Sequence, residues 1–221
     1  MNNKIIPLKI DGIEESIYAG FWIRLGALLL DGIFIAPLSY LIIFLNGFDK
    51  YIYFYTLIPN LIFSFWYNIY LTQKHGGTPG KVLAGIKIIK LDGADIGWKE
   101  AILRNLVLYI LTLFHMSIMI YCVIQADNDK FINLGWLERT VYLTTLSPLI
   151  FKINTWVMNA WIYSEFFVML LNKRKRAVHD FIAGTVMVKA KYLEHIKAAM
   201  SETELPTGEA LNKTDIIDDV I

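Results

Sequence analysis

The chain has 221 residues, of which 56% are hydrophobic and 14% are aromatic, and its mean hydropathy is +0.47. A soluble domain of this length buries an adequate core without so large an apolar excess, so the composition excludes an ordinary soluble protein and indicates a membrane protein. The formal net charge of +1 gives no reason to expect a nucleic-acid partner.

The first apolar stretch, residues 19–45, is long enough to cross a bilayer but contains Arg24 and Asp31. A charge at the centre of a membrane helix costs about 2.5–3.5 kcal/mol on insertion scales, so both residues need an explanation. Arg24 lies near the start of the helix, where its guanidinium can reach the lipid headgroups. Asp31 lies almost two turns further on the same face, near the midplane, where a carboxyl needs a partner or becomes neutral.

Three further apolar stretches are each long enough to form a membrane span. They cover residues 51–72, 103–124 and 141–171. The last is interrupted by Pro148, Lys152 and Asn154, so we expect residues 141–151 to be interfacial or re-entrant and residues 153–171 to span the membrane. One long tilted helix is the alternative.

The cations of the loops are distributed unevenly. The segment between the second and third spans is rich in lysine, and the segment after the fourth opens with "NKRKR", whereas residues 46–50 and 125–140 carry few cations relative to their acidic residues. Loops rich in lysine and arginine remain on the cytoplasmic side. We therefore expect a multi-pass protein of the cell membrane with both termini in the cytoplasm.

The two ends of the chain are more polar than its centre. We divide it into a cytoplasmic segment (1–17), a transmembrane domain (18–190) and an acidic cytoplasmic tail (191–221). Residues 1–17 lack the features of a secretory signal peptide. From Tyr192 onward the chain is polar and acidic, so we expect a solvated and largely disordered tail.

Two segments resemble one another. The sequence "GKVLAGIKIIK" begins at Gly80 and "HDFIAGTVMVK" begins at His179, and each follows a pair of expected spans. Both end in an alternating, β-branched run typical of a short strand, over residues 86–90 and 185–189. The expected fold is an all-α membrane protein, a four-helix bundle with these strands paired at the cytoplasmic face. Two parallel helix–helix–strand repeats would explain the similarity, and chance is the alternative.

The motifs that often carry chemistry are absent or incomplete. "GGTPGK" at Gly76 lacks the spacing of a phosphate-binding loop and is interpreted as a turn, with Lys81 available to a lipid phosphate or a carboxylate. The four histidines have no metal-ligand spacing, so no metal or other cofactor is expected. We expect His115 to be a hydrogen-bonding residue inside the bundle and Cys122 to be a small core residue.

The motif "AGFWIRLGALLLDG", followed by "TPGK" and "RAVHDFIAGTVMVK", resembles the RDD family of integral membrane proteins. That family is named for one arginine and two aspartates, which by resemblance are Arg24, Asp31 and Asp180. The resemblance covers residues 18–190, and residues 141–150 look like an addition to the family pattern. It implies transport of undefined ligands, with ion antiport attributed to some members.

Transport is the first functional hypothesis. Asp31, with Glu165 behind it, would bind a proton or cation, while Arg24, Asp180, Arg104 and Lys81 would form a structural or functional charge network. We expect Arg24 to pair with Asp180 at the cytoplasmic boundary, leaving Asp31 a separate polar partner. Four helices leave a narrow pathway, so transport would need a homo-oligomer or a larger membrane complex.

The alternative function is a non-catalytic membrane scaffold or an accessory subunit of a larger complex. In that case Arg24, Asp31 and Asp180 would clamp the helices together. An enzyme is not expected, because Asp31 and Asp180 differ too much in depth to act as a catalytic pair. The expected partners are the lipid bilayer and an ion or small solute.

Overall fold

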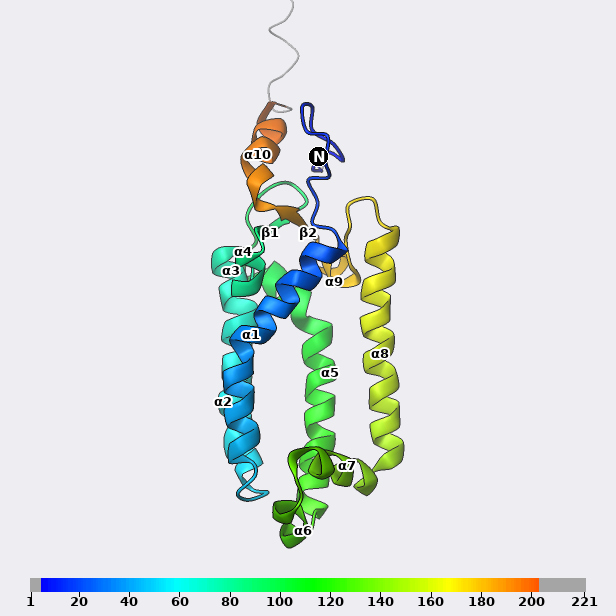
Figure 1. Ribbon diagram of the computed structural model, residues 1–221. Helices are drawn as coiled ribbons and strands as arrows, with labels where there is room; N and C mark the ends of the chain where they lie inside the picture. Colours follow the sequence, from blue (N-terminus) through cyan, green and yellow to red (C-terminus); the bar gives the residue numbers. More distant parts are fainter. Residues whose placement is uncertain (1–4, 203–221) are drawn as a thin grey trace, which may run out of the picture.

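The computed structural model describes residues 5–202, which are mostly helical and include one two-stranded sheet (Figure 1). The axes of the long helices are roughly aligned, and the chain reverses direction from one long helix to the next (Figure 1). They are α1 (Phe21–Leu45), α2 (Ile52–Phe65), α5 (Trp98–Gln125) and α8 (Pro148–Leu171). Among the described residues, α1 and α5 are long and apolar enough to cross a membrane.

The second expected span consists of three consecutive helical segments. Helix α2 continues directly into a π-helical turn, η1 (Trp66–Tyr70), and then into α3 (Leu71–His75). A π-helical turn widens the helix and rotates the side chains that follow it, and such turns are frequent at functional sites. Gly76 ends α3 in the left-handed conformation, with φ of 75°.

The expected pairing of the two short strands is confirmed. β1 (Ile86–Lys90) pairs antiparallel with β2 (Thr185–Lys189), so that Ile88 lies opposite Met187. The segment that precedes α1 extends this sheet, because Tyr18 forms a bridge to β2. Three chain segments that are far apart in sequence are therefore joined at one end of the molecule.

This end of the molecule has its own apolar core, and we call residues 5–20, β1, β2 and α10 (Leu193–Glu202) the cap. The buried core residues are Ile6, Ile17, Tyr18, Ile89, Val186, Val188 and Ile196. The expectation of a disordered tail from Tyr192 is wrong for residues 192–202, because Leu193, Ile196 and Met200 recur at helical spacing and pack on this core. Residues 203–221 lie outside the described part.

The opposite end contains two short helices, α6 (Asn128–Asn133) and α7 (Trp136–Leu146). Helix α7 ends at Leu146, and Ser147 separates it from α8. Pro148 occupies the first turn of α8, where a missing backbone N–H is tolerated. The expected boundary between residues 151 and 153 is therefore wrong, and so is the alternative of one long helix. A separate α7 leads into a fourth long helix that begins five residues earlier than expected.

Two cations, the buried Lys50 and the half-buried Arg139, satisfy helix ends on this side. Lys50 donates to the carbonyl of Ile124 at 3.3 Å and also to that of Ala126, at the C-terminus of α5. Arg139 donates to the carbonyls of Phe131 at 2.9 Å and Asn46 at 3.2 Å. A cation at a helix C-terminus satisfies free carbonyls and complements the helix dipole.

Two isolated polar positions behave as expected. The ring Nδ1 of His115 lies 3.0 Å from the amide nitrogen of Asn154, which joins α5 to α8, and Cys122 is fully buried. Two short helices, α4 (Pro79–Leu83) and α9 (Val178–Ala183), precede β1 and β2 respectively. This recurring order agrees with two repeats, but the repeat remains a prediction.

Candidate functional site

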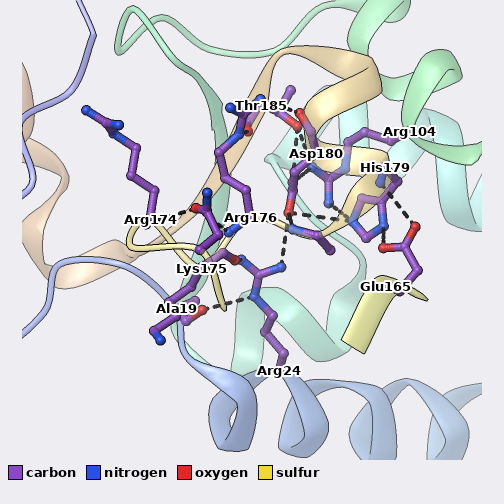
Figure 2. Close-up of polar contacts among 12 residues, drawn as sticks. Ala19, Arg24, Arg104, Glu165, Arg174, Lys175, Arg176, His179, Asp180 and Thr185 are labelled. Atoms are coloured by element: carbon purple, nitrogen blue, oxygen red, sulfur yellow. Dashed lines mark hydrogen bonds and ion pairs between the residues drawn. The ribbon is translucent and has the colours of Figure 1, made fainter. Parts of the chain in front are cut away.

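Asp180, in the first turn of α9, is fully buried and lies between two arginines (Figure 2). Its Oδ2 is 3.1 Å from Nη1 of Arg24 in α1, so the expected pair is confirmed. Its Oδ1 also contacts Nη1 of Arg104 in α5. One carboxylate therefore ties two long helices to α9.

Neutral donors complete the environment of Asp180. The backbone N–H of Ala177 donates to Oδ2 at 3.0 Å, and the hydroxyl of Thr185 donates to Oδ1 at 3.2 Å. Burial disfavours the charge, but Arg104, His179 and Arg24, together with the Ala177 N–H, hold the pKa of Asp180 well below its usual range. The carboxylate is ionised at neutral pH.

Arginines of this region also bind backbone carbonyls. Arg24 donates through Nε to Ala19 at 3.0 Å and through Nη2 to the carbonyl of Lys175. Arg176 donates to the carbonyls of Thr185 and Asp180, both at 2.9 Å. Much of the basic cluster after α8 is thus committed to internal contacts.

His179 connects this cluster to Glu165 near the end of α8. The backbone N–H of His179 donates to Oε1 of Glu165 at 3.1 Å, and its ring Nδ1 lies 2.5 Å from Oε2. Its Nε2 lies 2.8 Å from Nη2 of Arg104. Because arginine can only donate, Nε2 accepts from Arg104 in this arrangement, while Nδ1 faces Glu165. The structure places Glu165 beside His179 and not behind Asp31.

Asp31 is nearly buried and has a different set of partners. Its Oδ1 accepts from the hydroxyl of Tyr67 at 2.6 Å and from the backbone N–H of Gly80 at 2.7 Å. Its Oδ2 accepts from the hydroxyl of Thr78 at 2.5 Å, while Nζ of Lys81 is 3.8 Å away. Three neutral donors and one more distant lysine therefore surround this carboxylate.

Close contact between α4 and α1 explains this arrangement. A Cβ added to Gly80 would lie 2.4 Å from the carbonyl oxygen of Ala27 and 2.6 Å from the backbone nitrogen of Asp31, so only glycine allows the approach. The π-helical turn presents Tyr67 from the other side. The "TPGK" motif is therefore not simply a turn, because it starts a short helix that packs against Asp31.

A cavity of about 420 Å³ is lined by partners of both aspartates, namely Lys81, which lies near Asp31, and Arg104, which contacts Asp180. Its ionisable lining residues are Lys81, Arg104, Glu165 and His179. Ile88 and Met187, which pair across the sheet, form the wall on the side of the cap. Asp31 is not among the described residues that line the cavity, but it contacts Lys81, which is.

The model of one protein family, described as the RDD family, matches residues 18–184. The chain belongs to the RDD family. It is also 26% identical over 202 residues to YckC of Bacillus subtilis (strain 168), a protein described as uncharacterized; the match covers 89% of this chain and 96% of that protein. No solved structure matches the chain.

In this RDD protein, the arginine and two aspartates assigned by resemblance form two separate sites. Arg24 and Asp180 belong to one, and Asp31 belongs to the other. His179, Thr185, Tyr67 and Thr78 belong to these sites although no sequence pattern singles them out. Arg104 is predicted only as part of the charge network. Like Arg24, however, it follows a tryptophan at the start of an expected span, and this shared position indicates that it also pairs with a carboxylate.

Proposed function

We propose that this RDD protein crosses the cell membrane four times, through α1, the α2–η1–α3 stretch, α5 and α8, with the cap in the cytoplasm. The cation-rich loops support this orientation. The N-terminal segment and α10 belong to the same cap, which fits an even number of spans. The side chains that the long helices expose are largely apolar, as contact with lipid requires.

We further propose that the protein transports an ion or small solute through the cavity beneath the cap. The observation that carries this proposal is the presence of four ionisable side chains, Lys81, Arg104, Glu165 and His179, around one cavity between helices. Charged groups at membrane depth are costly and mark binding sites or pathways when they face a cavity.

Each site has a role in this proposal. Asp180 holds α1, α5 and α9 together and keeps Arg104 at the cavity wall. Glu165, beside His179, is the acidic group of the cavity wall that would bind an ion. Asp31 does not line the cavity itself, so in this proposal it influences a bound ion or proton through the charge of Lys81, which does. A homo-oligomer or larger complex would supply a wider pathway.

Flux measurements in proteoliposomes test the proposal. A pH-sensitive dye is enclosed, and gradients of Na⁺, K⁺ and Cl⁻ are imposed across vesicles that contain wild type, Asp31→Asn or Lys81→Gln. Lys87→Gln is the matched control, because Lys87 also forms an ion pair, with Asp95 at 2.7 Å, but does not line the cavity. We expect a flux above that of empty vesicles that falls at least severalfold in the first two variants only.

A scaffold or accessory subunit is the second candidate. The scaffold is favoured by the carboxylates of Asp31 and Asp180, whose oxygens already have hydrogen-bond donors. Both carboxylates make contacts that join helices at the cap side of the molecule. If no gradient produces flux above that of empty vesicles, the transport proposal fails and the scaffold is preferred.

A further inference from the structure

Lys81 has donors to spare at the cavity wall. An ammonium group has three N–H donors, and within the described part of the chain Nζ of Lys81 makes one hydrogen bond, to the hydroxyl of Thr78 at 3.0 Å. The carboxylate of Asp31 at 3.8 Å is beyond hydrogen-bonding distance. About a quarter of the side chain is exposed, and it lines the cavity.

Arg104 has spare donors at the same wall. Of its five N–H groups, those on Nη1 contact Asp180 and Thr185, and one on Nη2 contacts His179. Within residues 5–202, its Nε and the second hydrogen of Nη2 make no hydrogen bond. Two cationic side chains thus present unused donors to one cavity.

The acidic side chain of the cavity wall, Glu165, is already in contact with His179. Its Oε1 accepts from the backbone N–H of His179, and its Oε2 lies 2.5 Å from Nδ1 in an ion-pair contact that lacks hydrogen-bond geometry. Asp180 and Asp31 lie behind the wall and already accept from their own donors. Among the charged groups of the lining, two cations carry unused N–H donors, while the carboxylate of Glu165 already contacts His179, so the lining favours an anion.

We propose that the cavity binds the oxyanion of a small amphipathic molecule, a carboxylate or phosphate held by Lys81 and Arg104. An oxyanion can accept hydrogen bonds from both cations at once and also compensates their charge, which a neutral or cationic ligand does not. The remaining lining includes Leu28, Leu108, Trp161 and Ile162, which accommodate an apolar chain. This inference names a substrate class for the proposed function and rests on it.

The charge on Lys81 agrees with this assignment. Burial is the main reason that the pKa of Lys81 falls to about 8, Arg104 and Arg24 lower it further, and Asp31 raises it. A bound anion would add a second opposite charge next to the ammonium and favour its protonated form.

Binding of hexanoate to the purified protein in neutral detergent tests the inference. Isothermal titration calorimetry measures the heat, and the tryptophan fluorescence of the protein reports on Trp161 at the cavity, with Trp161→Phe as the control for that signal. Hexanol and hexylammonium have the same chain with no charge or the opposite charge. We expect saturable binding of hexanoate and much weaker binding of the other two. Equal affinities, or a preference for hexylammonium, would overturn the anion site.

Variants locate the bound molecule. Lys81→Gln should weaken hexanoate binding about 10- to 100-fold, as expected for loss of one hydrogen bond between charged partners, whereas Lys81→Arg should retain it. Lys87→Gln should bind as wild type. If Lys81→Gln does not fold, Leu108→Phe, which fills the apolar part of the cavity without removing a charge, should weaken binding at least severalfold. Unchanged affinity in the folded variants overturns the inference.

Two nanodisc preparations distinguish the source of the anion. If phosphatidylglycerol competes with hexanoate and phosphatidylcholine does not, the anion is a lipid headgroup; if neither competes, it is a soluble molecule. The outcome is separate from that of the flux experiment. If an ion gradient produces flux but hexanoate does not bind, the substrate class is rejected alone. If hexanoate binds but neither hexanoate nor any tested ion crosses the membrane, transport is rejected alone.

Discussion

Asp180 and Asp31 are both buried carboxylates of one charge network, but their partners differ in charge. Asp180 lies between the guanidinium groups of Arg24 and Arg104, which come from two different long helices. Asp31 accepts from neutral donors and has Lys81 only at 3.8 Å. The first site is compensated by charges that do not titrate near neutral pH, and the second by one that does.

This difference separates a fixed site from an adjustable one. Each arginine contacts Asp180 through one nitrogen and also binds other groups, and arginine keeps its charge, so the Asp180 site is suited to hold helices together. The ammonium of Lys81 lies 3.8 Å from Asp31 and at the cavity wall, and with a pKa of about 8 its charge changes as the pH rises above neutrality. The account therefore assigns stability to Asp180 and ligand response to Lys81.

The largest effect is expected for Asp180→Asn. The substitution leaves two buried arginines without their carboxylate, which should cost about 3–5 kcal/mol of unfolding free energy. Denaturant unfolding in detergent, followed by circular dichroism, measures the loss. Asp92→Asn, an exposed carboxylate that accepts from the Ala94 N–H at 3.0 Å, is the control and should stay within about 1 kcal/mol of wild type.

The same site determines behaviour in acid. The pKa of Asp180 is lowered by folding, so its stabilisation is complete above the ordinary value of 3.8 and is lost as pH falls below it. Wild type should therefore lose more stability than Asp180→Asn between about pH 5 and pH 2. Parallel loss in the two proteins would show that Asp180 is not held by its arginines.

Gly80→Ala should have the next largest effect. The added methyl meets backbone atoms of Ala27 and Asp31 at 2.4 and 2.6 Å, which cannot move away as a flexible side chain would. We expect a loss near the upper end of about 1–3 kcal/mol, measured by thermal unfolding. Gly26→Ala, where an added Cβ meets nothing within 4 Å, is the control in the same helix as Asp31. Similar melting temperatures for the two variants would argue against close packing of α4 on α1.

A smaller effect is expected from the pH dependence of Lys81. Folding lowers the pKa of Lys81 from 10.5 to about 8, so the unfolded chain binds more protons between these values. The contribution of Lys81 to stability should therefore increase as pH rises from 8 to 10.5, by about 2 kcal/mol. Lys81→Met should lack this increase, as shown by unfolding at both pH values. The charges that act on Lys81 are those of Asp31, Arg104, Arg24 and Asp180.

The fold could be predicted from the sequence where one strong pattern decides the structure. Apolar length predicted α1 and α5, and alternation in two similar segments predicted the pairing of β1 with β2. The packing of α10 on the cap depends on tertiary contacts between segments far apart in sequence, whereas the boundary at Ser147 has a local signal in Pro148 that the apolar composition outweighed. Local composition therefore misplaced one helix start and suggested disorder where a helix packs.

The candidate site shows the same division. The Arg24–Asp180 pair could be predicted because both residues belong near the cytoplasmic boundary. The partners of Asp31 could not, because they depend on a π-helical turn that presents Tyr67 and on a glycine contact that brings Thr78 close. Neither feature has a local sequence signal as clear as hydrophobic length.

The most direct test of the division between a fixed and an adjustable site is the affinity for hexanoate at pH 7 and pH 9.5. The account predicts that wild type binds hexanoate much more weakly at pH 9.5, because Lys81 loses its proton as pH passes through about 8. Lys81→Arg should bind almost equally at both pH values, because arginine keeps its charge. Equal pH dependence in wild type and Lys81→Arg would contradict the claim that Lys81 is the responsive charge of the cavity.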